Sequence, residues 1–159
     1  MRISIICVGR IKEKYWAQAI EEYVKRLSRY CKLEIKELQD EKTPDGCSDA
    51  IRRQILAKEG ARILGALKGD EYVAALAIEG GSYSSESFAE FIDGLGKGGR
   101  SHIAFVIGGS LGLDKSVTGR ADFLISFSDM TFPHQMMRVI LLEQIYRAYR
   151  IINNEPYHK

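Results

Sequence analysis

The sequence predicts an α/β fold, a parallel sheet with helices on both faces. Segments with the pattern of strands and helices alternate along the chain, and two predicted strands, 72–78 and 102–107, are nearly continuous apolar runs. Such runs are typical of strands that helices cover on both faces of a parallel sheet. The length of 159 residues fits one domain with its own core, so we expect a single domain over residues 1–159.

The first half of the chain predicts two strands and two helices. Residues 2–8 and 32–38 alternate between apolar and polar side chains, as half-buried strands do, and residues 13–30 carry apolar side chains at helical spacing. Ser48 is a suitable N-cap for a second helix that ends near Leu67. The side chains expected to point inward from this helix are Ile51, Ile55, Ala61, Ile63 and Leu64.

The second half predicts strands at 72–78, 102–107 and 123–127, with a helix at 85–95 and a final helix begun by Pro133. The final helix has little polar surface, so it must be buried nearly all round. A chain of this size can hardly surround a terminal helix unaided, and we therefore expect a second subunit to cover part of it, in a homodimer. A central core helix in a monomer is the alternative that periodicity leaves open.

The composition is that of an ordinary globular protein, with 45% hydrophobic and 28% charged residues. No apolar run approaches the roughly 20 residues that a membrane helix needs, and the apolar run at the N-terminus is too short for a signal peptide. Cys7, Cys31 and Cys47 form no C-x-x-C motif and have no histidine at metal-ligand spacing. We therefore expect a soluble cytoplasmic protein with neither a disulfide framework nor a metal site.

Basic residues gather near the N-terminus, although the net charge of the chain is only +2. Residues 1–36 hold nine basic and four acidic side chains. A solvated helix face explains this excess most simply, and a patch that contacts phosphates is the alternative.

Three bends of the chain are expected to form a ligand site. In open α/β sheets, ligands bind beyond the carboxyl ends of the strands. The segments that follow those ends here are 79–81, 108–112 and 127–132. Pro133 begins a helix directly after the last of them, so several unpaired backbone N–H and C=O groups meet at one place. The pattern predicts a ligand that is recognised through the main chain.

The segment Gly108-Gly-Ser-Leu-Gly112 matches the G-x-S-x-G nucleophile elbow of serine hydrolases. Chain order also permits a triad, whose members could come from Ser110, Asp122, Asp129, His134 and His158. Hydrolases of that fold are usually much longer than this chain, however, and no glycine-rich oxyanion segment precedes the elbow. A tight glycine turn that lets a ligand approach the backbone is favoured, with a serine hydrolase as the alternative.

Several motifs together carry a resemblance to a known family. They are Val8-Gly-Arg-Ile-Lys12 with Tyr15-Trp16, Phe105-Val-Ile-Gly-Gly-Ser110, Ser126–Arg138, Glu143-Gln144 with Tyr146-Arg-Ala148, and Pro156-Tyr-His158. Over essentially its full length, the chain resembles the RlmH branch of the SPOUT methyltransferases. The resemblance implies a homodimer whose C-terminal segment forms a deep trefoil knot, a rare exception to unknotted topology. It also implies methylation of N3 of pseudouridine 1915 in helix 69 of 23S rRNA, on the assembled 70S ribosome.

The resemblance also implies the cofactor, S-adenosylmethionine, and the residues that hold it. Leu76 would pack on the adenine, Gly108 would admit the cofactor closely, and a loop would wrap it with main-chain groups. The members of this loop are Phe127, Ser128, Asp129, Met130, Thr131 and Phe132. A glycine-lined apolar slot suits such a ligand. No metal is needed, because the sulfonium is already a strong electrophile and the protein need only position the nucleophile.

The nucleophile implied by the resemblance is an imide nitrogen that must lose its proton, so a base or an anion stabiliser is required. Candidates are His158 as the proton acceptor or its relay, Tyr157 as a stacking or hydrogen-bonding platform, and Arg138 to steady charge on the uracil ring. Without the resemblance, a terminal histidine indicates only a disordered tail. We expect His134 to be structural and Trp16 to belong to the core.

A small net charge means that RNA affinity must come from a local patch. The candidates are Arg2, Arg10, Lys12 and Lys14, near the dimer seam. The whole ribosome would supply further contacts, so binding to naked RNA should be weak. A non-catalytic RNA-binding domain is the second alternative to an enzyme.

Overall fold

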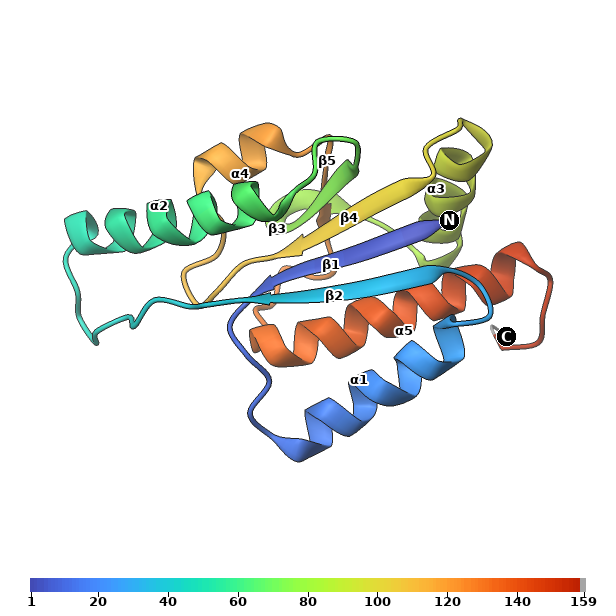
Figure 1. Cartoon of the computed structure of the whole chain (residues 1–159), viewed down its shortest axis with the longest axis horizontal. Coiled ribbons are helices and arrows are strands. Elements are labelled where there is room, and N and C mark those ends of the chain that lie inside the picture. The colour runs from blue at the N-terminus through green and yellow to red at the C-terminus, as the bar shows by residue number, and fades with distance from the viewer. Residues whose placement is uncertain (158–159) are drawn as a thin grey trace.

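The computed structural model describes residues 1–157, and the predicted α/β fold is confirmed (Figure 1). Five parallel strands form one sheet in the order β2-β1-β4-β3-β5. The strands are β1 (Arg2–Val8), β2 (Lys32–Leu38), β3 (Tyr72–Ser82), β4 (His102–Ile107) and β5 (Phe123–Ser126). The helices are α1 (Lys14–Leu27), α2 (Asp49–Ala66), α3 (Ser85–Lys97), α4 (Lys115–Arg120) and α5 (His134–Ile152).

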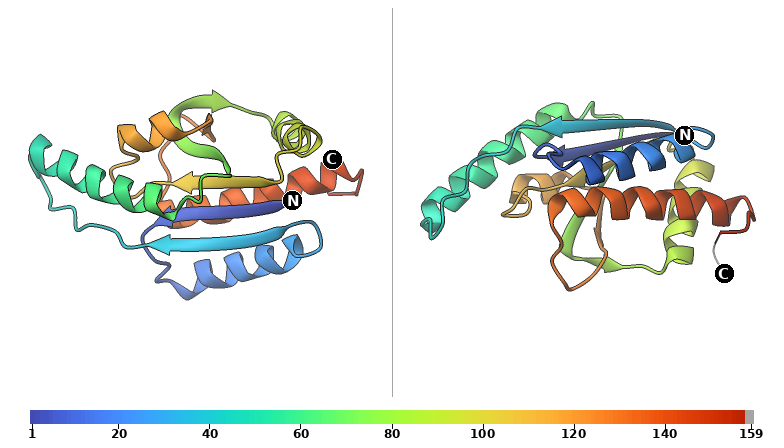
Figure 2. Two further views of the ribbon diagram at one scale, coloured as in Figure 1. Left: turned by 45° about the horizontal axis from the view of Figure 1, so that its top comes forward. Right: turned by 90° about the horizontal axis from the view of Figure 1, so that it is seen from below.

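Helices cover both faces of the sheet, as Figures 1 and 2 show: α1, α3 and α5 lie on one face, and α2 and α4 on the other. Alternate side chains of the central strand β4 enter the two hydrophobic clusters. Ile103 and Phe105 pack among α1, α3 and α5, whereas Val106 packs with Ile63 of α2 and Val117 of α4. All six residues of β4 are buried, which explains why its sequence is a continuous apolar run.

Helix α2 begins where the sequence predicts, because the Ser48 side chain accepts a hydrogen bond from the Ile51 backbone N–H. The prediction of inward-pointing side chains is wrong for two residues, because Ile51 is 41% exposed and Ala61 is also exposed. The first turns of α2 project beyond the sheet, as Figure 1 shows, so they have nothing to pack against. Burial begins at Ile55 and Ile63, over the strands.

Strand β3 is longer than its pattern predicts, because it contains an irregularity. Ile125 of β5 pairs with both Leu76 and Gly81, and the register shifts between those two residues. A Cβ atom on Gly80 would lie 2.6 Å from the backbone N and C atoms of Ile125. Only glycine allows that close approach of two backbones, and the strand resumes after it.

Helix α5 runs from the carboxyl edge of the sheet back to its amino edge, antiparallel to the strands (Figure 1). Every one of its residues is at least partly buried, which agrees with the prediction. The most buried are Arg138, Leu141, Leu142, Ile145, Ala148 and Tyr149. The C-terminal trefoil knot stays a prediction.

Within residues 1–157, none of the helices combines the length and the apolar character that crossing a membrane requires.

Candidate functional site

A pocket of about 690 Å³ opens at the carboxyl edge of the sheet. This volume lies within the range of small-molecule and cofactor sites. Its walls come from β3 (residues 76–78), from the end of β4 and the turn after it (107–112), and from the end of β5 through the start of α5 (125–128, 130–134 and 137). The position agrees with the rule that ligands of open α/β sheets bind beyond the carboxyl ends of the strands.

Two of the three predicted bends meet in this pocket, namely 108–112 and most of 127–132. The third, residues 79–81, does not line it; Leu76, Ala77 and Ile78 of β3 take that place. Of the eight residues that the resemblance assigned to the cofactor, seven line the pocket: Leu76, Gly108, Phe127, Ser128, Met130, Thr131 and Phe132. Asp129 lies in the same loop but not in the lining.

Sequence reasoning gave no site role to Ala77, Ile78 and Met137, which also line the pocket. Only Ile78 had a usable signal, because it closes the apolar run of β3.

Apolar side chains at the pocket are open to solvent. Met130 is 73% exposed, Ile78 56% and Phe132 39%. Clustered exposed apolar side chains usually mark a surface that a ligand or a partner covers. The pocket is therefore suited to a ligand with an apolar, flat portion.

The glycines of the segment 108–112 are needed by the loop itself. Gly112 has a positive φ of 87°, and its N–H donates to the Gly109 carbonyl over 3.1 Å. A Cβ atom on Gly108 would lie 2.3 Å from the Gly112 carbonyl oxygen, and one on Gly109 would lie 2.8 Å from Oε2 of Glu59. This geometry agrees with the tight glycine turn that the sequence favours.

The loop after β5 is ordered by hydrogen bonds within itself. The hydroxyl of Ser126 donates to the Ser128 carbonyl over 3.1 Å, and the Met130 N–H donates to the Ser128 hydroxyl over 3.0 Å. Short polar side chains hold the turn from within, and the Phe127 ring anchors its first residue edge-on against Phe88 of α3, with centroids 6.2 Å apart.

The geometry does not assemble a hydrolase triad in residues 1–157. The Ser110 hydroxyl lies 3.2 Å from that of Thr43. Asp122 accepts from the Val73 N–H over 2.8 Å and from Arg120 over 3.3 Å. Within residues 1–157, no hydrogen bond joins the side chain of Ser110 or Asp122 to a histidine. The hydrogen bonds that these two side chains make are those of structural residues.

Arg138 is buried and does not line the pocket, with 1% of its side chain exposed. Its Nη2 donates to the carbonyls of Val8 (3.0 Å) and Gly9 (2.7 Å), and its Nη1 donates to Oε1 of Glu37 (2.6 Å). The guanidinium thus holds the carboxyl ends of β1 and β2 against the start of α5. Its predicted role on the uracil ring stays a prediction, and these contacts favour a positioning role.

His134 lines the pocket at the first position of α5. Burial first, and then the positive charge of Arg138, lower the pKa of His134 below its usual value. The imidazole is therefore neutral at pH 7. Its ring lies against Gly9, where a Cβ atom would be 3.2 Å from Nε2, and this packing agrees with the structural role expected for it.

Tyr157 does not line the pocket but packs on the second half of α5. Its hydroxyl donates to Glu143 over 3.4 Å, and its ring contacts Tyr146 edge-on at 5.0 Å and lies 4.7 Å from Cζ of Arg147. Glu143 follows Met137, the last pocket residue on α5, by six residues, about 9 Å along the helix axis. His158 lies outside the described residues.

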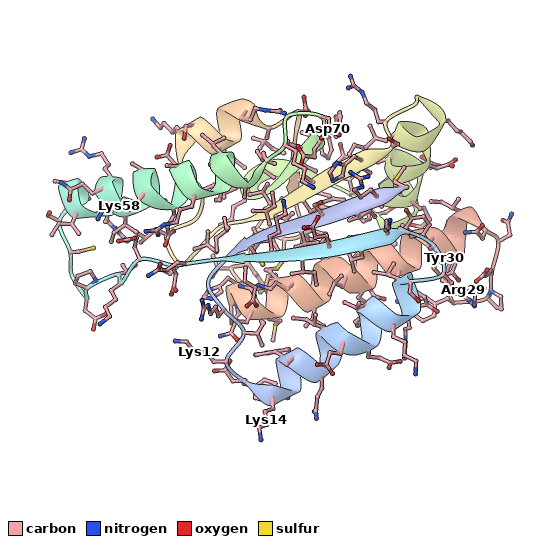
Figure 3. All side chains as sticks on the ribbon, in the orientation of Figure 1. Lys12, Lys14, Arg29, Tyr30, Lys58 and Asp70 are labelled. Carbon is pink, nitrogen blue, oxygen red and sulfur yellow. The ribbon has the colours of Figure 1, made fainter. Side chains whose placement is uncertain are left out.

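A short basic segment borders the pocket. Arg10, Lys12 and Lys14 are exposed and follow the carboxyl end of β1, and Figure 3 shows Lys12 and Lys14 projecting beside the start of α1. The Lys12 N–H donates to Oε1 of Gln135 in α5 over 3.3 Å. Arg2, which was expected in the same patch, starts β1 and so lies at the other edge of the sheet.

Within residues 1–157, one set of side chains lies close enough together to hold a metal ion. It consists of Asp70, Glu71 and His102, at the amino edge of the sheet. Glu71 already accepts hydrogen bonds from the N–H groups of Lys68 and Gly69. Nε2 of His102 lies 2.9 Å from the Ser4 hydroxyl. These contacts fasten the turn before β3 to the sheet, which gives the group a structural purpose far from the pocket.

Comparisons with known proteins agree with this geometry. The family described as "Predicted SPOUT methyltransferase" matches residues 1–158. Two curated relatives, each named ribosomal RNA large subunit methyltransferase H, come from Bifidobacterium adolescentis (61% identical) and Clostridium novyi (62% identical), and each alignment covers 100% of both chains. A solved structure from Haemophilus influenzae, titled as a probable methylase family protein, has a TM-score of 0.56 at 13% identity. The superposition covers 99% of this chain and 70% of the solved chain. At this low identity, the similarity supports the fold alone.

Proposed function

Because the chain belongs to the SPOUT methyltransferases, and within them to the RlmH family of large-subunit ribosomal RNA methyltransferases, we propose that it methylates N3 of pseudouridine 1915 in helix 69 of 23S rRNA with S-adenosylmethionine. One observation carries the proposal. The segments with the family's motifs, 105–110 and 126–138, come together with β3 around one open pocket at the carboxyl edge of the sheet.

The residues of the pocket fit S-adenosylmethionine. Its volume of about 690 Å³ suffices for a ligand of that size, and the side chains of Ile78, Met130 and Phe132 leave apolar surface for an adenine. Leu76, Gly108 and the loop 127–132 would hold the cofactor. The bound cofactor supplies a methyl group on a cationic sulfur that is already electrophilic, so the reaction needs no metal.

The enzyme acts as a homodimer in this proposal, because one chain separates the two halves of the site. The pocket lies at the N-terminal end of α5, whereas Tyr157 packs on Glu143, Tyr146 and Arg147 in the second half of the helix. A two-fold axis that pairs α5 with a second copy in antiparallel fashion brings each C-terminus to the other copy's pocket. The partly buried apolar side chains Met136, Val139 and Ile140 offer α5 surface for such a contact.

In this dimer, Tyr157 and His158 of one copy meet the base that the other copy's pocket serves. The imide nitrogen of the pseudouridine must lose its proton before it attacks the methyl group. His158 accepts that proton or relays it, and Tyr157 stacks on the base or hydrogen-bonds to it. Arg138 acts from behind the pocket, where it fixes the start of α5 against β1 and Glu37.

Arg10, Lys12 and Lys14 contact the RNA backbone beside the pocket. Three cations supply little affinity alone, so the assembled ribosome, in the cytoplasm, is the substrate. Binding to bare helix 69 RNA as tight as to 70S ribosomes would contradict this.

The direct test is transfer of a radiolabelled methyl group from S-adenosylmethionine to ribosomes that lack the modification. Incorporation at N3 of this pseudouridine supports the proposal, and its absence from wild-type reactions refutes it. A fluorophosphonate probe tests the hydrolase alternative, since covalent labelling of Ser110 would favour it. Calorimetry that detects no binding of S-adenosylmethionine or S-adenosylhomocysteine would favour a non-catalytic RNA-binding domain.

His158→Ala tests the base. It should lower turnover far more than it lowers cofactor affinity, and unchanged turnover would exclude His158. Mixing His158→Ala with a pocket-deficient variant, Gly108→Ala, tests the shared site. A mixed dimer has one pocket and one tail that are both intact, so it should regain activity that neither variant has alone.

A further inference from the structure

The chain reverses direction directly after α5. The helix ends at Ile152, and Asn154 adopts a positive φ of 51°, which is uncommon for a residue other than glycine. The N–H of Glu155 then donates to the Arg150 carbonyl over 2.8 Å. Residues 155–157 therefore fold back along the helix instead of continuing its axis.

The carboxylate of Glu155 joins three partners at this reversal. Oε1 accepts from Nη2 of Arg29 over 3.1 Å, and Oε2 accepts from the Tyr30 hydroxyl and from Nη1 of Arg150. The hydrogen bond from Tyr30, and then the charges of Arg150 and Arg29, lower the pKa of Glu155 below its usual value. The group is therefore ionised at pH 7, and both of its oxygens are engaged.

The partners belong to two separate parts of the fold and are themselves fixed. Arg29 and Tyr30 come from the turn between α1 and β2, which Figure 3 shows beside the end of the chain, and Arg150 comes from α5. The Tyr30 ring stacks on that of Tyr149 with centroids 5.4 Å apart. Nη2 of Arg150 also donates to the Pro156 carbonyl over 3.1 Å, so the residue next to Tyr157 is held as well.

We propose that Glu155 is a positioning residue for the methyl transfer: with Arg29, Tyr30 and Arg150 it holds the turn after α5 that returns Tyr157 to the side of the helix. This inference rests on the proposed function, in which Tyr157 serves the second copy's pocket. Without the carboxylate, the turn loses three contacts, Tyr157 samples more positions and the productive arrangement becomes rarer. Positioning errors of about 1 Å can cost a factor of 10² in rate.

Glu155 should contribute far more to turnover than to stability. The side chain of its partner Arg29 is 62% exposed, and such exposed ion pairs add little to folding; Arg150 is only 15% exposed, but it keeps its hydrogen bonds to Tyr30 and to the Pro156 carbonyl when the carboxylate is removed. The pocket lies at the other end of α5, so the cofactor affinity of the same chain should not depend on Glu155. A turnover defect with intact folding and cofactor binding is therefore the signature of positioning.

The experiment compares Glu155→Ala and Tyr30→Phe with Asp93→Ala. The control carboxylate lies on α3, is 33% exposed and pairs only with Lys97 among the described contacts. Four quantities are measured for each dimeric protein: kcat on ribosomes, calorimetric affinity for S-adenosylhomocysteine, melting temperature and amide hydrogen exchange of residues 153–157.

We expect Glu155→Ala to lower kcat at least tenfold and to speed the exchange, with cofactor affinity unchanged within twofold. Tyr30→Phe should fall between Glu155→Ala and wild type, and Asp93→Ala should match wild type.

Each outcome decides the proposal. Wild-type kcat or unchanged exchange in Glu155→Ala overturns it, as does a loss of cofactor affinity or a melting temperature lower than that of the control by 10 °C or so. If wild type itself transfers no methyl group, the proposed function fails, while the exchange data still decide whether Glu155 holds the tail. Regain of activity on mixing Glu155→Ala with Gly108→Ala supports a defect confined to the tail.

Discussion

Replacing Gly108 by alanine should damage the proposed cofactor pocket through a backbone clash. The new Cβ atom would lie 2.3 Å from the Gly112 carbonyl oxygen and 2.6 Å from its carbon. Ordinary contact begins near 3.4 Å, so the oxygen must retreat by roughly 1 Å. A backbone atom cannot swing aside as a flexible side chain can, and the whole turn 108–112 has to move.

The size of the effect follows from that displacement. Overpacking a tight site typically costs about 1–3 kcal/mol of folding free energy. The loop that moves also lines the pocket, so we expect a loss of cofactor affinity of at least tenfold, equivalent to about 1.4 kcal/mol. Urea unfolding measures the first quantity, and calorimetric titration with S-adenosylhomocysteine measures the second.

Gly65→Ala is the matched control, because it is the same chemical change inside α2 with nothing within 4 Å of the added Cβ atom. Alanine should stabilise that helix by roughly 0.5–1 kcal/mol and leave cofactor affinity unchanged. Wild-type affinity in Gly108→Ala would refute the reasoning, because the pocket would then not depend on the shape of the turn.

Three further predictions concern buried or engaged polar groups. Arg138→Met should lower the free energy of unfolding, measured in urea, by at least about 2 kcal/mol, since Glu37 loses its ion pair and the Val8 and Gly9 carbonyls lose the guanidinium donor; an unchanged midpoint would contradict it. Burial raises the pKa of Glu59 above 4.5, so the folded state binds the proton more tightly and stability is lost as pH rises through the folded pKa. Glu59→Gln should therefore be more stable than wild type at pH 7 and equal to it below about pH 4, by thermal melting. Ser110→Ala should keep turnover within about threefold of wild type, because only its contact with Thr43 is lost.

The sequence was sufficient for elements whose signal is local. Strands β1, β2 and β4 have the predicted bounds, because alternation or a continuous apolar run marks each of them. Ser48 was identified as an N-cap for the same reason, since its partner is three residues away. Gly80 and Gly81 were interpreted as a turn, but β3 continues through them, because the close approach of β5 is a tertiary contact that the local pattern does not contain.

The candidate site divides in the same way. The rule for parallel sheets brought the loops after β4 and β5 to one pocket without any knowledge of side-chain contacts. The partners of Arg138 were out of reach, since Glu37 lies 101 residues away in the sequence. Tyr157 was assigned to the active site through the resemblance, and its position against Glu143 and Tyr146 depends on a chain reversal after α5 that periodicity does not give.

The direction of α5 links the fold to the proposed homodimer. A parallel sheet gathers its binding loops at one edge, and a helix that follows the last strand must run back toward the other edge. Helix α5 therefore ends at the amino edge, where the carboxylate of Glu155 binds Arg29 and Tyr30 and holds the turn that returns Tyr157 to the helix. The pocket and Tyr157 thus lie on different parts of one chain. In the proposed homodimer, two-fold symmetry completes both sites at once, so methyl transfer should be lost on dilution at the concentration at which the dimer dissociates.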